Sequence, residues 1–182
     1  MKNNLIKTLS IFFLFFLMNN FAEASLYNFS FNGIDGEKID LKKFIGKPII
    51  IVNTASFCGY TNQYQQLQNL FEKYKKNDLV LIGVPSNDFG NQEFKKNKEV
   101  KEFCETKFNI SFKLTEITKI KNKDGHSFFK WVKTQNGFLS FPKWNFYKYL
   151  FDRNGNLVSW FSSITEPNSK TFLKEVENII KK

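Results

Sequence analysis

The stretch from residue 48 to residue 70 changes its hydrophobic period midway, and this change constrains the fold more than any other feature of the chain. The β-branched run Ile49–Val52 is typical of a strand buried on both faces. From Thr61 onward the apolar residues return every three or four positions, which predicts an amphipathic helix. Cys58 lies between the two, in a strand-to-helix turn. Because the N-terminal end of a helix favours a thiolate over a thiol, this position predicts a reactive cysteine.

Other patterns predict what surrounds this strand and helix. A second apolar run, residues 79–84, follows the helix, and a strand, helix, strand order predicts a parallel pair. Turn signals after Phe31 predict an N-terminal β-hairpin. The remaining predicted elements are a strand over 145–151, its antiparallel partner over 157–161, and helices over 98–108, 128–132 and 168–182. Together these predict an α/β fold in which a mixed sheet carries helices on both faces.

Three ordered motifs resemble the signatures of the glutathione peroxidase family in its cysteine-containing form. They are NTASFCGYT at 53–61, PSNDFGNQE at 85–93 and WNFYKYL at 144–150. The resemblance covers the chain from about residue 26 to its end. It implies a thioredoxin-like fold, with a central mixed β-sheet flanked by helices and preceded by a β-hairpin.

The resemblance also implies a catalytic set made of Cys58, Gln92, Trp144 and Asn145. An ionised Cys58 can attack the distal oxygen of a peroxide and become a sulfenic acid. The other three residues carry amide or indole N–H groups. Such neutral donors can stabilise both the thiolate and the leaving oxygen.

Cys104 is the only other cysteine of the chain. Two cysteines in a secreted protein are commonly a structural disulfide. The resemblance to thioredoxin-dependent members of the family favours a second role, in which Cys104 resolves the Cys58 sulfenic acid to a disulfide. The Cα atoms of a disulfide lie within about 7 Å of each other, so a helix that turns Cys104 away from Cys58 must partly unwind during turnover.

The resemblance implies no bound cofactor and a thiol reductant as co-substrate. Trp160 stands where family members often carry a basic residue that helps hold glutathione, and together with Cys104 this favours a thioredoxin-like reductase partner. Lys148, within the third motif, keeps glutathione open as the alternative. Only twelve residues separate Trp131 from Trp144, so the long insert of tetrameric members is absent. The resemblance therefore implies a monomer like those of the phospholipid-hydroperoxide subgroup.

The net charge of +10 bears on partners. A basic surface attracts anionic head groups, which leaves peripheral membrane contact open. The lysines are scattered and form no dense stripe with aromatic residues, so we expect no nucleic-acid binding. His126 is the only histidine and the cysteines are far apart, so we expect no metal site, and His126 is expected to lie at the surface or to cap a helix.

The first 24 residues have the pattern of a secretory signal peptide. Lys2 and Lys7 precede an apolar run, and the small residues Ala22 and Ala24 provide a cleavage site near Ala24. An uncleaved anchor is the alternative, but the run is shorter than the ~20 residues of a spanning helix. The sequence thus predicts a secreted or periplasmic protein whose peroxidase domain comprises residues 25–182.

The expected function is that of an antioxidant thiol peroxidase, acting on hydrogen peroxide and on organic or lipid hydroperoxides in the response to oxidative stress. A peroxide sensor or thiol redox relay needs the same activated Cys58 and stays open as an alternative. A thiol:disulfide oxidoreductase is disfavoured because Cys58–Thr61 lacks the second cysteine of a Cys-x-x-Cys pair.

Overall fold

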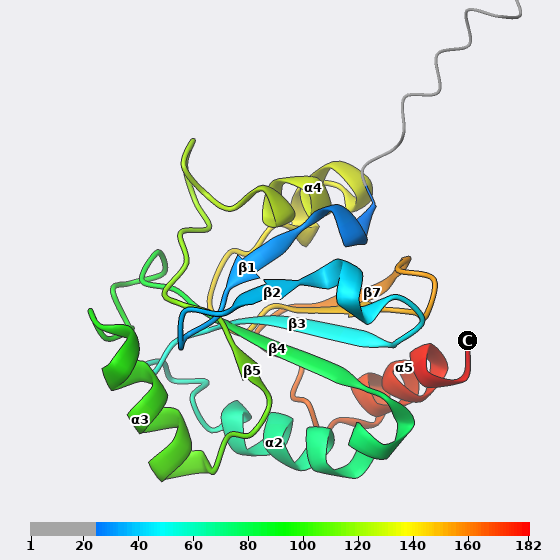
Figure 1. Ribbon diagram of the computed structural model, residues 1–182, viewed down its shortest axis with the longest axis horizontal. Helices are drawn as coiled ribbons and strands as arrows, with labels where there is room; N and C mark the ends of the chain where they lie inside the picture. Colours follow the sequence, from blue (N-terminus) through cyan, green and yellow to red (C-terminus); the bar gives the residue numbers. More distant parts are fainter. Residues whose placement is uncertain (1–24) are drawn as a thin grey trace, which may run out of the picture.

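The central sheet is built around β3 (Ile49–Thr54), the apolar run at which the hydrophobic period changes. The computed structural model describes residues 25–182, and Figure 1 shows β3 in the middle of a sheet with strand order β5-β4-β3-β6-β7. β3 pairs in parallel with β4 (Val80–Pro85) and antiparallel with β6 (Lys148–Phe151). The two edge strands are β5 (Lys113–Leu114) and β7 (Leu157–Phe161). All residues of β3, β4 and β6 are buried, as expected for strands covered on both faces.

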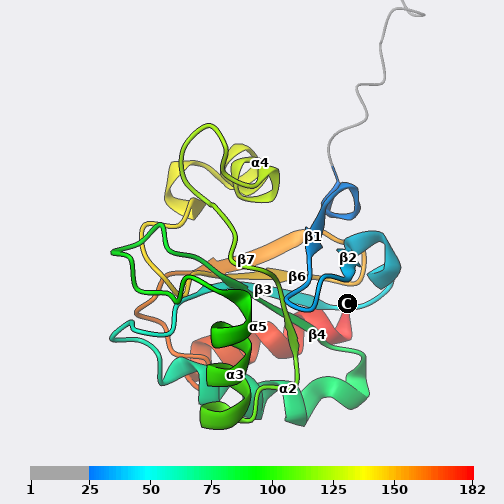
Figure 2. The ribbon, with the colours of Figure 1, turned by 60° about the vertical axis from the view of Figure 1, so that its left-hand side comes forward.

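Helices cover one face of this sheet, and a helix with a β-hairpin covers the other (Figures 1 and 2). Ile50 and Val52 point into the core shared with the helices α2 (Gln63–Tyr74), α3 (Asn97–Phe108) and α5 (Lys170–Lys181). Ile49 and Ile51 point the opposite way, because successive strand residues alternate between the two faces. Their core is shared with α4 (Ser127–Asn136) and with the hairpin of β1 (Ser30–Asn32) and β2 (Lys38–Asp40). The predicted mixed sheet and hairpin are therefore confirmed.

Short 3-10 turns connect these elements. They are η1 (Leu26–Asn28), η2 (Leu41–Phe44), η3 (Lys75–Asn77) and η4 (Phe138–Ser140). His126 caps α4, because its Nδ1 accepts a hydrogen bond from the Phe128 amide. Its ring is half-buried and stacks on Phe31 at 4.2 Å between centroids. The capping prediction for His126 is thus correct, and this side chain ties the hairpin to α4.

The strand predicted over residues 145–151 begins later than expected. β6 starts at Lys148, and residues 144–147 form a turn in which Phe146 has a φ of +63°. The side chain of Asn53 binds the backbone of this turn, so these residues cannot continue the ladder of β6. The predicted strand was therefore wrong over its first three residues.

Two predictions concern the N-terminus and the membrane. The predicted signal peptide, residues 1–24, lies outside the described residues. Among residues 25–182, none of the helices has the length and apolar character that crossing a bilayer requires.

Candidate active site

Cys58 lies in the turn that joins the carboxyl end of β3 to α2, as the sequence predicts. The turn is closed by the Thr61 hydroxyl, which donates to the Cys58 carbonyl at 2.5 Å, and by the Thr61 amide, which donates to the same carbonyl at 3.0 Å. The Cys58 side chain is 6% exposed, and its Sγ accepts a hydrogen bond from the Tyr60 amide at 3.5 Å. α2 begins only at Gln63. The thiol is therefore held just ahead of the helix, close beneath the surface.

Gln92 reaches this turn through the loop that follows β4. The Gln92 carbonyl accepts a hydrogen bond from the Phe57 amide at 2.9 Å, one residue before Cys58. The loop is shaped from within by Asn87, whose Oδ1 accepts from the Glu93 amide at 2.9 Å and whose Nδ2 donates to the Phe94 carbonyl at 3.0 Å. The loop and the cysteine turn thus form one hydrogen-bonded unit.

Asn145 contacts Gln92 from the turn before β6, the strand that pairs with β3 on the side away from β4. Its Nδ2 donates to the Gln92 side-chain carbonyl at 3.1 Å and to the Phe89 carbonyl at 3.3 Å. The Asn145 side chain is fully buried, and within the described part of the chain its Oδ1 has no hydrogen-bond partner. With its oxygen occupied by Asn145, Gln92 keeps both hydrogens of its amide nitrogen for another acceptor.

Trp144 packs over the same loop. Gly90 has a φ of +77°, and a Cβ added to it would lie 3.2 Å from the Trp144 ring, so glycine permits both the turn and the close approach. The Trp144 side chain is 39% exposed. The structure therefore gathers Gln92, Trp144 and Asn145 in one place, adjacent to the backbone that carries Cys58.

Asn53 is a residue of the site to which the sequence analysis gave no role. Its Oδ1 accepts from the Tyr147 amide at 2.9 Å and its Nδ2 donates to the Trp144 carbonyl at 3.0 Å. Its backbone carbonyl accepts from the Phe146 amide at 2.6 Å. The sequence signal for it was a polar side chain at the end of a fully buried strand, where burial demands hydrogen-bond partners.

Cys104 lies on α3 and is fully buried. Cys58 and Cys104 are both free thiols in this structure. Burial raises the pKa of the Cys104 thiol to about 12, the charges of Glu93 and Glu105 add to this, and the neighbouring Tyr64 hydroxyl acts in the opposite direction. Cys104 therefore stays protonated while α3 remains as it is.

Glu93 is a buried carboxyl next to Gln92, and sequence reasoning did not single it out. Burial raises the pKa of this carboxyl, while the nearby Ser56 and the Phe94 amide oppose the shift. Its Oε1 accepts from the Phe94 amide at 2.8 Å, and its Oε2 is buried with no partner among the described residues.

Lys148 is not placed to hold glutathione. Its side chain is fully buried on β6, and its Nζ donates to Gln63 Oε1 at 2.7 Å, to the Thr165 carbonyl at 2.7 Å and to the Ser162 carbonyl at 3.1 Å. Burial lowers the pKa of the Lys148 ammonium to about 7, and the charge of Glu166 opposes this shift. All three hydrogens of the ammonium are used inside the protein, so this basic residue offers nothing to a ligand.

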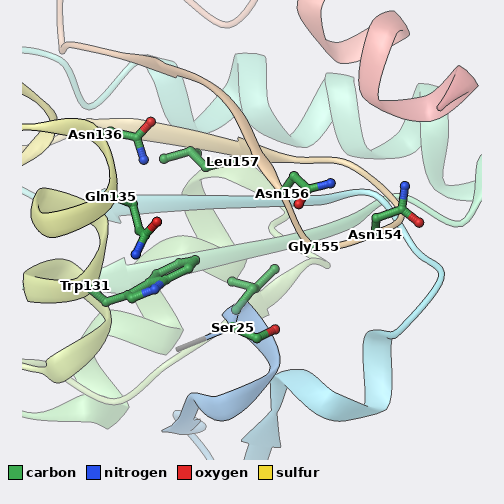
Figure 3. A pocket seen from close by; sticks show the side chains of 9 residues that line it. Ser25, Trp131, Gln135, Asn136, Asn154, Gly155, Asn156 and Leu157 are labelled. Carbon is green, nitrogen blue, oxygen red and sulfur yellow. The ribbon is translucent and has the colours of Figure 1, made fainter. Parts of the chain in front are cut away.

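A pocket of about 380 Å³ lies away from the cysteines (Figure 3). Figure 3 shows Trp131 and Gln135 of α4 on one side and Asn154 and Asn156 of the β6–β7 turn on the other. Asn145 lies just before β6 and this turn just after it, so the pocket and the cysteine site lie at opposite ends of that strand. In residues 25–182 no group of three or more histidine, cysteine, aspartate or glutamate side chains could hold a metal ion.

Comparisons with known proteins bear on this arrangement. The family model described as glutathione peroxidase matches residues 26–133. Hydroperoxy fatty acid reductase gpx1 of Synechocystis is 38% identical over 155 residues, which are 81% of this chain and 92% of that protein. Glutathione peroxidase-like peroxiredoxin 2 of Saccharomyces cerevisiae is 35% identical over 162 residues, which are 87% of this chain and 99% of that protein.

Two solved structures show the same architecture. The crystal structure of Trgpx in its apo form is similar at a TM-score of 0.70 and 29% identity, over 87% of this chain and 97% of that one. A thioredoxin-family thiol:disulfide interchange protein from Chlorobium tepidum is similar at a TM-score of 0.63 over 84% of this chain and 92% of its own, at 14% identity. The second likeness shows the fold alone, and the thioredoxin-like fold is thereby confirmed.

Proposed function

Since this chain belongs to the glutathione peroxidase family, whose members are peroxide-reducing oxidoreductases, we propose that it reduces hydroperoxides through Cys58 and Cys104 with a thioredoxin-like protein as reductant. The observation that carries the proposal is the junction of three chain segments. The backbone carbonyl of Gln92 binds the Cys58 turn, and the side chain of Gln92 binds the side chain of Asn145. This junction supports a role for these side chains as donors to the Cys58 thiolate and to the leaving oxygen.

In the first step, the Cys58 thiolate attacks the distal oxygen of the peroxide. The O–O bond breaks, Cys58 becomes a sulfenic acid, and the leaving oxygen takes up a proton and departs as water or an alcohol. The free N–H groups of Gln92 and the indole N–H of Trp144 stabilise the thiolate and the developing oxyanion. Asn145 contributes by holding the Gln92 amide in a fixed orientation.

In the second step, Cys104 attacks the sulfenic sulfur of Cys58. The S–S bond forms, the hydroxyl of the sulfenic acid leaves, and with the proton of the Cys104 thiol it becomes water. Because Cys104 is fully buried and its pKa is raised to about 12, α3 must first unwind around it. The reductant then supplies two electrons and two protons to restore both thiols.

Two residues, Cys104 and Lys148, bear on the choice of reductant. When Cys104 resolves the sulfenic acid, the species that the reductant must reduce is an intramolecular disulfide. A protein with two thiols is suited to this reaction. Lys148, the basic residue of the third motif, is buried and committed to internal hydrogen bonds. We therefore favour a thioredoxin-like partner over glutathione.

The proposed substrates are hydrogen peroxide and organic or lipid hydroperoxides. The Synechocystis relative is named for its action on hydroperoxy fatty acids. Trp144 and Phe57 leave 39% and 55% of their side chains exposed beside the site, which suits a substrate with an apolar tail. The exposed Phe138 and Leu139, with Lys143 Nζ 3.2 Å from the Phe138 ring centroid, suit peripheral contact with an anionic membrane surface.

The test is the intact mass of the reduced, purified protein after one equivalent of peroxide. The wild type should lose two hydrogens and both free thiols. The Cys104→Ser variant should instead gain one oxygen at Cys58, and Cys58→Ser should not react. A wild type that gains one oxygen while Cys104 stays open to alkylation contradicts the two-cysteine cycle, and a wild type unchanged by peroxide contradicts the peroxidase itself.

The sensor or relay function remains the second candidate, because it needs the same first step. Steady consumption of peroxide with thioredoxin and its reductase present supports the peroxidase. A single turnover followed by transfer of the disulfide to a partner's thiol supports the relay. We extend the proposal to a monomer in a secreted or periplasmic location. A mature protein whose intact mass corresponds to cleavage after Ala24 would support this location.

A further inference from the structure

A continuous chain of hydrogen bonds leads from the buried Lys148 ammonium to the backbone of Asn145. Lys148 Nζ donates to Gln63 Oε1 at 2.7 Å, and Gln63 Nε2 donates to the Ser163 carbonyl at 2.7 Å. The Ser163 hydroxyl then donates to the Asn145 carbonyl. Every side chain of this chain is at least 96% buried.

Lys148 also fixes the segment that carries Ser163. Its other two hydrogens go to the carbonyls of Ser162 and Thr165, which flank Ser163 along the chain. The three acceptors come from two elements that are distant in sequence, the first turn of α2 and the segment between β7 and α5. The ammonium therefore joins both to β6, at the end of that strand nearest to Asn145.

A buried ammonium without an ion pair is expensive, because it gives up its hydration. No salt bridge of Lys148 is found within residues 25–182, and burial lowers its pKa to about 7 against the opposing charge of Glu166. The neighbouring inward-facing residue of β6, Leu150, shows that an apolar side chain suits this core. Stability alone therefore does not explain a lysine at this position.

We propose that Lys148 is a positioning residue for peroxide reduction, which through Gln63 and Ser163 holds Asn145 in place against Gln92. The inference rests on the proposed function, since it assumes that Asn145 serves the reaction of Cys58. Asn53 fixes the backbone on both sides of Asn145, and Ser163 fixes the carbonyl of Asn145 itself. Lys148 acts on the reaction from a distance and contacts neither cysteine nor substrate.

The experiment is a double-mutant cycle on the rate constant for oxidation of Cys58 by hydrogen peroxide. The variants are Lys148→Met, Asn145→Ala and the two combined, with Lys174→Met as an exposed lysine control that should match the wild type. Lys148→Met should be slower by about tenfold or more, since small displacements of a catalytic group have large effects on rate. The double variant should be no slower than Asn145→Ala, because Lys148 has nothing left to position.

If the two effects instead multiply, Lys148 does not act through Asn145 and the inference is wrong. Should Lys148→Met fail to fold, Ser163→Ala replaces it in the same cycle, because it removes the hydroxyl and leaves the carbonyl that Gln63 binds. The proposed function is judged separately, on the wild type and on Asn145→Ala. A wild type inert to peroxide overturns the peroxidase, and an Asn145→Ala variant as fast as the wild type overturns the role of Asn145.

Discussion

The side-chain amide of Asn145 donates a hydrogen bond to the side-chain carbonyl of Gln92 at 3.1 Å, across 53 residues of sequence. This bond sets the direction of the Gln92 amide, since its oxygen is engaged and its nitrogen points elsewhere. It joins the loop after β4 to the turn before β6, the two strands that flank β3.

Replacing Gln92 by alanine should slow oxidation of Cys58 by hydrogen peroxide about 10²-fold, the usual loss when one donor to a developing oxyanion is removed. The reaction is followed by quenching with a thiol-blocking reagent and measuring intact mass. Gln65→Ala is the matched control, because Gln65 is exposed on α2 and bonds only to Asn69 among the described residues. Equal rates for the Gln92 and Gln65 variants would exclude Gln92 from the reaction.

Replacing Asn53 by leucine should lower the free energy of unfolding by about 1–3 kcal/mol. The change leaves the Tyr147 amide and the Trp144 carbonyl buried without their partners. The same variant should slow the peroxide reaction, because the turn that carries Asn145 loses its anchor. Urea denaturation measures the first effect, with Asn69→Leu on the exposed face of α2 as control. A stability equal to that of the control would contradict the anchoring role.

Cys104 in the reduced protein should be alkylated far more slowly than an exposed cysteine. The pKa rises from 9.0 to about 12, which lowers the thiolate fraction about a thousandfold at neutral pH. Iodoacetamide labelling with peptide mass analysis, at pH 7 and in 6 M urea, measures this. Unfolding should abolish the protection. Rapid labelling of Cys104 in the folded protein would show that α3 already opens in the reduced state.

Lys148 should make the protein more stable as the pH rises from about 7 to 10.5. Its pKa is lowered from 10.5 to about 7, so in this range the unfolded chain binds the proton that the folded chain has lost. The effect reaches at most about 5 kcal/mol. Unfolding of Lys148→Met should show a flatter pH dependence than the wild type, and Lys174→Met should not. A slope unchanged in Lys148→Met contradicts the burial of a titrating ammonium.

Glu93 should make the protein less stable as the pH rises, which is opposite to the effect of Lys148. Its pKa is raised mainly by burial, so the folded protein keeps a proton that the unfolded chain loses, and stability falls as the pH rises through the folded pKa. Glu93→Gln keeps the shape without the charge. Its melting temperature should exceed that of the wild type by more at pH 8 than at pH 5. A gain that shrinks with pH would mean that the Glu93 carboxylate is stabilised where it lies.

Most of the fold was predictable from the sequence, because the runs at β3 and β4 are continuous and the helices have clear apolar faces. The gathering of Gln92 and Asn145 was expected only through the resemblance of their motifs. No local pattern records a contact across 53 residues. The strand start at Lys148 was missed for the same reason, since the turn before it is imposed by Asn53, which lies on another strand.

The buried polar groups were the least predictable part. Lys148 kept glutathione open as the reductant, because lysine is rarely buried and periodicity cannot reveal three internal acceptors. Glu93 stood in a loop of polar residues, and only the packing of Ser56 and Phe94 shows that its carboxyl is enclosed. Sequence patterns predict which face is apolar, whereas the partners of a buried charge depend on the assembled structure.

The anchoring of residues 144–147 by Asn53 has a consequence for how the protein is made. On the ribosome, Cys58 is synthesised long before Trp144, which lies 91 residues after Asn53. Until then β3 lacks its neighbour β6, and the turn that carries Asn145 does not exist. The proposed partners Trp144 and Asn145 therefore join Cys58 only late in synthesis, and an incomplete chain lacks the assembled site.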